Sequence, residues 1–202
     1  YFNVFAGGSK KGYRHLVDSS LDWGQDLPAL KEWLDEHDLQ GDAARQVYVG
    51  YFGTADPRYY GIEGTLLPAT FMYPAGDVRP WSAGVYCISA TNLQGNYVTR
   101  TYGAWTEDDE QRYQRLQQAA VTILSAAVDP QQRNALLNEY GAEYLQNVIR
   151  NFNLARLGRL NAVLRQREPD DQIGYSILVY RLNDDDLTEA LLGPAPIETH
   201  LR

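Results

Sequence analysis

The sequence of 202 residues has no long apolar run. Its longest apolar stretch covers residues 119–128 and is interrupted by Thr122 and Ser125, whereas a helix that crosses a bilayer needs about 20 apolar residues. We therefore expect the chain itself to be soluble. Because 44% of its residues are hydrophobic and 22% are charged, it can form a packed core, and its length predicts one domain, alone or with a substantial insertion.

Cysteine, methionine and basic residues are also scarce. Cys87 is the only cysteine, which excludes an internal disulfide and a cysteine-based metal site. The only methionine is Met72 and the first residue is Tyr1, so we expect a processed chain or a piece of a longer protein. The 26 acidic residues outnumber the 18 basic ones and give a net charge of −8. This balance argues against nucleic acid as a partner, since nucleic-acid binding requires a basic face.

Common catalytic motifs are absent from the sequence. It contains no G-x-S-x-G elbow, no phosphate loop ending in G-K-[ST] and no G-x-G-x-x-G after a predicted strand. The three histidines, His15, His37 and His200, lie far apart, so no pair has the spacing of metal ligands. We therefore assign no catalytic residue, no metal and no cofactor.

The apolar pattern predicts alternating strands and helices. Nearly unbroken apolar runs, typical of strands buried on both faces, cover 47–52, 84–91 and 176–182, and 15–18 is a further candidate strand. A helix is predicted over about 26–37 from the spacing of Leu27, Leu30 and Leu34. Together these elements predict an α/β fold with a mostly parallel central sheet of about four or five strands and helices on both faces.

The chain divides into three parts. Residues 1–14 hold Lys10, Lys11 and Arg14 without an acid, which predicts a solvated lead-in or a segment close to anionic lipid headgroups. Residues 15–182 are predicted to form a single α/β domain, in which 107–167 has helical apolar spacing and forms a helical insertion. Residues 183–202 carry five acids and one arginine and are predicted to be an acidic tail.

The loops that follow predicted strands carry polar and aromatic side chains. Because parallel strands place such loops at one edge of the sheet, we expect the loops 18–26, 53–61 and 91–95 to meet and form the main cleft. The candidate binding residues are Asp18, Asp22, Trp23, Gln25, Asp26, Asp56, Arg58, Tyr59, Tyr60, Asn92 and Gln94.

These residue types suit a polar, ring-shaped ligand. Carboxylates hold a divalent cation or sugar hydroxyls, aromatic rings offer flat apolar faces, and amides add donors and acceptors. In the alternative interpretation Asp26 caps the helix, Asp18 binds loop amides and Asp22 is solvated, and the three loops tie one another into a rigid edge without a ligand. Cys87, in a buried strand, is predicted to be a core residue.

Long stretches of the sequence resemble a known family. They read YFN…GG…GYRHLVDSSLDWGQDLPALKEWL, VYVGYFGTADPRYYGI, GVYCISATNLQGNY and GYSILVYRL. Over roughly residues 1–106 and 172–182 the chain is similar to the C-terminal region of polytopic bacterial membrane glycosyltransferases related to dolichyl-phosphate-mannose–protein mannosyltransferases, glycosyltransferase family 39 in the broad sense. In that pattern Ser20 stands where an asparagine is expected, and the helical insertion and the acidic tail lie outside the match.

The resemblance implies an extracytoplasmic domain that follows the last membrane helix of an enzyme using a polyprenyl-phosphate sugar donor. It implies that Asp18, Asp22, Trp23, Gly24, Gln25 and Asp26 form a signature loop. The catalytic carboxylates of the family are expected near its N-terminal membrane helices, so no catalytic residue is assigned to this chain. The implied partners are the membrane-embedded part of the parent protein and a glycan or protein acceptor, which the domain binds or positions on the extracytoplasmic side of a bacterial membrane.

Two other functions remain open from the sequence. The chain is alternatively a free-standing α/β enzyme that acts on sugars or nucleotides through the loop 18–26, or a structural or oligomerising domain. Several apolar spans of about 20 residues upstream of Tyr1 would favour the membrane glycosyltransferase, whereas a signal peptide or an ordinary translation start would favour the free-standing enzyme.

Overall fold

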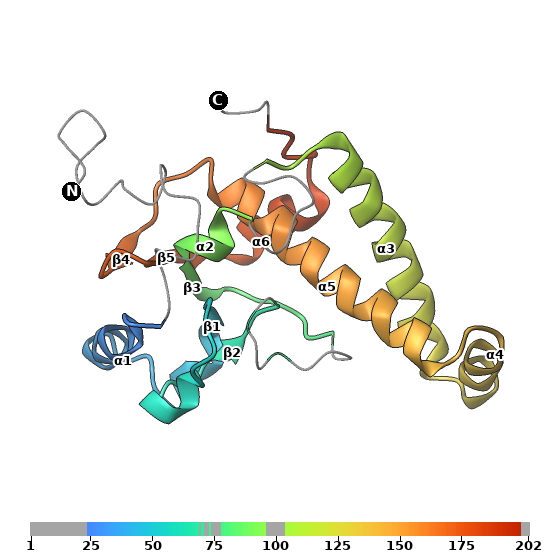
Figure 1. The fold of residues 1–202 in the computed structure, drawn as a ribbon, viewed down its shortest axis with the longest axis horizontal. Helices are drawn as coiled ribbons and strands as arrows, with labels where there is room; N and C mark the ends of the chain where they lie inside the picture. Colours follow the sequence, from blue (N-terminus) through green and yellow to red (C-terminus); the bar gives the residue numbers. More distant parts are fainter. Residues whose placement is uncertain (1–23, 69, 71–72, 74–77, 96–103, 199–202) are drawn as a thin grey trace.

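The structure, a computed structural model, describes residues 24–68, 70, 73, 78–95 and 104–198, and in this part of the chain five strands form one sheet (Figure 1). The strands are β1 (Val47–Gly50), β2 (Thr65–Leu66), β3 (Gly84–Ser89), β4 (Asp171–Ile173) and β5 (Ile177–Leu182). Their order across the sheet is β2-β1-β3-β5-β4. The α/β class and the predicted number of strands are confirmed, whereas the candidate strand 15–18 lies outside the described residues.

The prediction of a mostly parallel sheet is wrong, because the sheet is mixed. β1 is parallel to β2 and β3, but β5 is antiparallel to both β3 and β4. β4 and β5 form a hairpin, whose strands run in opposite directions. The pairing of β5 with β3 extends from Leu182 opposite Gly84 to Ile177 opposite Ser89. A continuous apolar run indicates that both faces of a strand are covered, but it does not indicate whether the strand runs parallel or antiparallel to its neighbours.

Helices cover both faces of this sheet, as predicted. On one face α1 (Leu27–Glu36) packs its buried leucines against Val85 and Cys87 of β3. On the other face α5 (Ala142–Leu164) and α6 (Asp184–Leu192) pack against Tyr86 and Ile88. The β3 residues that contact α1 alternate with those that contact α5 and α6, because successive side chains of a strand point to opposite faces. Three short helices lie in the connections: η3 (Gly41–Gln46) between α1 and β1, η4 (Pro57–Tyr60) between β1 and β2, and α2 (Ala90–Leu93) directly after β3.

The predicted helical insertion is confirmed. It consists of α3 (Glu107–Ala126), α4 (Pro130–Tyr140) and α5. α3 and α5 lie side by side and extend away from the sheet, with α4 at the far end (Figure 1). α3 starts at a capping box in which Thr106 and Asp109 bind each other's backbone N–H groups. Within the described residues, no helix is both long and apolar enough to cross a membrane.

The segment predicted to be an acidic tail contains the helix α6. Asn183 and Asp186 form a capping box at its start, and Asp184 and Asp185 lie in the same first turn, where the positive end of the helix dipole stabilises carboxylates. Leu187 of this helix is buried in the core beneath the sheet. The three aspartates of this segment therefore begin a packed helix.

The buried position of Cys87 leads to the first testable prediction. Cys87 lies in the middle of β3 and is 1% exposed. Burial raises the pKa of its thiol to about 12. Because a thiol reagent needs both access and the thiolate, we expect no labelling of the folded protein at neutral pH and complete labelling in denaturant. Cys87→Ser should lower the free energy of unfolding by roughly 1–3 kcal/mol through a buried hydroxyl. Rapid labelling without denaturant would contradict the position of β3.

Candidate ligand-binding site

The described parts of the three predicted loops meet at the carboxyl ends of β1 and β3. Asn92 Nδ2 donates a hydrogen bond of 2.9 Å to the carbonyl oxygen of Gly50, which joins the loop 91–95 to the end of β1. Gly24 and Gly53 both approach the Tyr51 hydroxyl so closely that a Cβ would lie 2.7 and 2.0 Å from Tyr51 Oη. The expected convergence is thus confirmed for these residues.

The charged side chains of the loop 53–61 bind each other. Arg58 Nη2 lies 2.8 Å from Asp56 Oδ2, and Arg58 Nε donates to Asp56 Oδ1 at 3.0 Å. The hydrogen bond from Arg58 lowers the pKa of Asp56, and Asp56 raises the pKa of Arg58. The rings of Tyr59 and Tyr60 meet edge to face at 5.4 Å. Tyr59 is 86% exposed, so it is the aromatic surface that this loop presents to solvent.

The other predicted binding residues divide into buried, exposed and undescribed positions. Asn92 is completely buried, and its carbonyl oxygen accepts a hydrogen bond of 2.8 Å from Asn161 of α5. Asn92 therefore connects the end of β1 to α5 and does not face solvent. Gln25 is exposed and Gln94 is half-buried. Asp18, Asp22 and Trp23 lie outside the described residues.

Asp26 holds the β4–β5 hairpin and does not cap α1. It stands at the N-cap position, but its side chain makes no capping hydrogen bond. Its Oδ2 instead accepts from the backbone N–H groups of Tyr175 and Ser176, both at 3.2 Å, and from Ser176 Oγ at 2.8 Å. Gly174, with φ of 56°, permits this approach, because a Cβ there would lie 2.3 Å from Asp26 Oδ2. The prediction that Asp26 caps the helix is therefore wrong.

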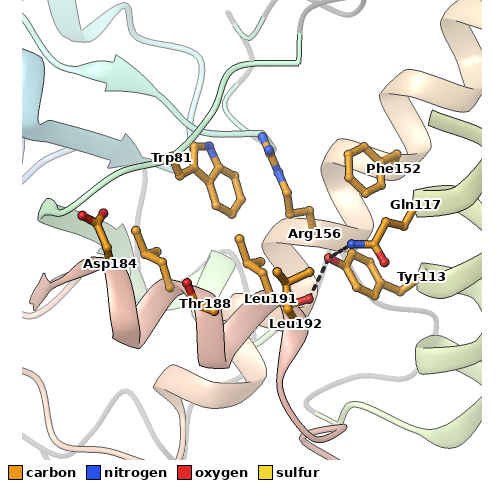
Figure 2. A pocket seen from close by; sticks show the side chains of 10 residues that line it. Trp81, Tyr113, Gln117, Phe152, Arg156, Asp184, Thr188, Leu191 and Leu192 are labelled. Atoms are coloured by element: carbon orange, nitrogen blue, oxygen red, sulfur yellow. Dashed lines mark hydrogen bonds between the residues drawn. The ribbon is translucent and has the colours of Figure 1, made fainter. Parts of the chain in front are cut away.

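A cleft that lies away from the three predicted loops is formed by the helical insertion, α6 and the residues before β3 (Figure 2). Its volume is about 280 Å³. Its inner wall contains the buried side chains of Tyr113, Phe152 and Leu187, and its rim contains Asp184 and Thr188, which are exposed. The cleft is thus open to solvent on one side and apolar on the other.

Arg156 of α5 brings a buried positive charge to this cleft, with the residue only 6% exposed. Its Nη2 donates to the carbonyl oxygen of Arg79 at 3.0 Å and to Asn153 Oδ1 at 3.3 Å. Its Cζ lies 3.9 Å from the ring centre of Trp81 and 5.6 Å from that of Phe152. Burial lowers the pKa of Arg156, but a guanidinium stays protonated at neutral pH.

Arg156 differs from the two other buried arginines nearby. Arg159 pairs with Glu110 at 2.9 Å, and Arg165 pairs with Glu198. Among the described residues, no carboxylate forms such a pair with Arg156, and its Nε has no hydrogen-bond partner there. Because buried charges are normally paired, Arg156 is an unusual residue for the wall of a cleft, and its buried Nε adds an N–H donor without a recorded acceptor.

The remaining polar groups of the cleft are ordered by hydrogen bonds. Tyr113 Oη donates to the carbonyl oxygen of Leu191 at 3.1 Å and accepts from Gln117 Nε2 at 3.4 Å. Burial raises the pKa of Tyr113, so its hydroxyl stays neutral. At the rim, Asp184 Oδ1 accepts from the backbone N–H of Ala83 at 2.9 Å. The cleft therefore combines aromatic walls with a few fixed polar groups, which is the usual composition of a small-molecule site.

One signal of this site was present in the sequence. Between residues 152 and 164 the only charged side chains are Arg156 and Arg159. A helix that is apolar on all sides is buried, so its charges need partners or ligands. The cleft itself is lined by residues near positions 81, 113, 152 and 184. These positions are far apart in the sequence, so no local sequence pattern predicts that they come together.

The role found for Asp26 leads to the second prediction. Asp26→Ala removes the acceptor for three hydrogen bonds, so we expect the free energy of unfolding in urea to fall by about 1–3 kcal/mol. Asp42 provides a matched control, because its side chain is 99% exposed and pairs with the exposed Arg45. Asp42→Ala should change the free energy by less than about 0.5 kcal/mol. Equal effects of the two substitutions would show that Asp26 does not hold the hairpin.

No family model matches the chain, and no curated protein and no solved structure is detectably similar to it.

Proposed function

We propose that this chain is the extracytoplasmic C-terminal domain of a polytopic membrane glycosyltransferase that uses a polyprenyl-phosphate sugar donor. In this proposal the domain binds or positions the acceptor and does not catalyse the transfer. The long motifs between residues 1 and 106 support the family. The observation that carries the role is the cleft beside Trp81, whose aromatic walls and polar rim suit the ring of a sugar.

The arrangement of the cleft side chains supports this ligand class. Figure 2 shows the Trp81 ring on one side of the cleft, with Thr188 and Leu191 on the side of α6. A sugar presents an apolar C–H face, which packs on an aromatic ring, and hydroxyl groups, which need donors and acceptors at its edge. Gln117 and Thr188 supply such groups within the lining of the cleft.

The small number of carboxylate side chains in the cleft supports a binding role over a catalytic one. Cleavage of a glycosidic bond by the usual mechanism requires two carboxylates that flank the bond. The described lining of the cleft contains one, Asp184. Within the described residues, no group of three or more histidine, cysteine, aspartate or glutamate side chains is placed to hold a metal ion. Transfer chemistry is therefore assigned to the membrane-embedded part of the parent protein.

A second candidate function, an oligomerising domain, is favoured by the exposed apolar surface of the helical insertion. Large apolar side chains that are more than one third exposed are frequent in and next to α4 along the chain, at Val121, Leu124, Val128, Leu137, Tyr140 and Tyr144, and the rings of Tyr140 and Tyr144 stack on each other. Apolar patches of this kind often mark contacts between proteins. Sedimentation of the purified chain distinguishes this function: a stable dimer that Leu137→Asp converts to a monomer would favour it.

The role of the cleft leads to the third prediction. In isothermal titration calorimetry with glucose, mannose and N-acetylglucosamine, we expect at least one sugar to bind to the native chain. Trp81→Ala should weaken this binding by about tenfold, since a lost aromatic contact of about 1.4 kcal/mol corresponds to that factor.

Trp33 provides the matched control for this measurement. It lies on α1, over the opposite face of the sheet, where it stacks on His37 at 4.0 Å. Trp33→Ala should leave the affinity for the sugar unchanged while removing an aromatic ring of the same size. If none of the sugars binds to the native chain, or if both tryptophan variants lose affinity equally, the cleft is not a sugar-binding site.

A further inference from the structure

Asp184 is the one carboxylate in the described lining of the cleft, and it lies where a ligand can reach it. The residue is exposed at the rim, whereas the positive charge of the lining belongs to Arg156, which is only 6% exposed. An ionised carboxylate accepts hydrogen bonds at both oxygens and donates none. The charged group that a ligand meets at the rim is therefore an acceptor.

A structural role accounts for one of the two carboxylate oxygens. Asp184 Oδ1 accepts a hydrogen bond of 2.9 Å from the backbone N–H of Ala83. This contact ties the segment before β3 to the first turn of α6 and fixes the orientation of the carboxylate. Asp184 Oδ2 has no hydrogen bond to any residue that the structure describes. The second oxygen is thus oriented by the fold and available to a ligand.

We propose that Asp184 determines the specificity of the cleft: its Oδ2 accepts a hydrogen bond from a hydroxyl group of an uncharged sugar, and its charge excludes anionic sugars such as uronic acids. This inference rests on the proposed function, because it specifies the class of sugar that the cleft binds. A hydrogen bond to a charged acceptor is stronger than one between neutral groups. An anionic group at the same place is repelled by the like charge of Asp184.

The opposite charge in the lining favours an uncharged sugar over a cationic one. In the view of Figure 2 the Trp81 ring lies between the carboxylate of Asp184 and the guanidinium of Arg156. Arg156 Cζ is 3.9 Å from the centre of that ring. A cationic group packed on Trp81 is therefore repelled by Arg156, as an anionic group is by Asp184. A ring with hydroxyl groups and no charge avoids both repulsions.

Thr188 supplies a second polar contact next to Asp184. It is exposed in the lining of the cleft and lies four residues after Asp184 within α6, so the two side chains share one face of the helix. The hydroxyl group of a threonine both donates and accepts. Asp184 and Thr188 together suit two hydroxyl groups of one sugar ring that packs on Trp81.

The test compares neutral sugars with charged counterparts on the native chain. Glucose, mannose and N-acetylglucosamine are titrated by calorimetry at low ionic strength, and so are glucuronate, mannuronate and protonated glucosamine, which differ from them by one group each. In each pair with a member that binds, we expect the neutral sugar to bind at least about tenfold more tightly, which corresponds to about 1.4 kcal/mol. Equal or tighter binding of the charged member would overturn the role of Asp184 and leave the sugar site standing. No binding of any of the six sugars would overturn both proposals.

Two variants of α6 then locate the selection. Asp184→Asn keeps an oxygen for the N–H of Ala83 but removes the charge, so it should weaken the binding of the neutral sugar by about tenfold and abolish its advantage over the uronic acid. Asp185→Asn is the matched control, because Asp185 lies in the same first turn, is exposed and is outside the described lining. It should change neither affinity by more than about twofold.

Circular dichroism establishes that both variants are folded. A folded Asp184→Asn protein that still prefers the neutral sugar to the uronic acid would overturn the role of Asp184. Equal effects of the two substitutions would overturn it as well, because they would assign the preference to the general charge of α6 and not to a contact with Asp184.

Discussion

A buried arginine, Arg159, connects the three helices that surround the cleft. It is 1% exposed on α5, and its Nε donates to Glu110 Oε2 of α3 at 2.9 Å. Its Nη1 donates to the carbonyl oxygen of Ala190 in α6, and its Nη2 donates to those of Gly193 and Pro194 at 2.8 and 3.1 Å. Because every nitrogen of this guanidinium has an acceptor, the positions of α3 and α6 relative to α5 are fixed, and with them the width of the cleft.

Arg159 and Arg156 show how one residue type serves two purposes on the same helix. The partner of Arg159, Glu110, also accepts a hydrogen bond of 2.9 Å from Trp105 Nε1, so both charges belong to a satisfied network. Such a network contributes little net stability but is costly to break, by about 3–5 kcal/mol when one partner is removed. Arg156, one turn earlier on α5, has no carboxylate among the described residues. The first arginine therefore organises the fold, whereas the second lies in the wall of the cleft.

The sequence predicted the elements of the fold better than their arrangement. Apolar spacing located α1, β1, β3, β5 and the helical insertion, because burial leaves a local pattern in the sequence. It did not give the direction of β5, since strands covered on both faces look alike whether parallel or antiparallel. The three acids at the start of α6 were assigned to an acidic tail, although the same residues also suit the first turn of a helix.

The candidate site was less predictable for the same physical reason. The edge at β1 and β3 was expected from topology, and Asn92 and Asp26 do lie at connections between elements, but their polar groups bind backbone groups from distant parts of the chain. The donors that satisfy Asp26 come from residues 149 and 150 positions away, which no spacing rule can reveal. The cleft depends in the same way on Arg159 and Glu110, whose separation of 49 residues carries no periodic signal.

The most direct measurement of the central claim is an NMR titration of the ¹⁵N-labelled chain with glucose, mannose and N-acetylglucosamine in turn. It reports, in one experiment, on the cleft and on the edge of the sheet that was predicted from the sequence. Our account predicts that the largest shifts occur at the indole N–H of Trp81 and at the backbone N–H of Thr188. Shifts confined to the loops 53–61 and 91–95 would contradict this account and would place the binding site at the edge of the sheet.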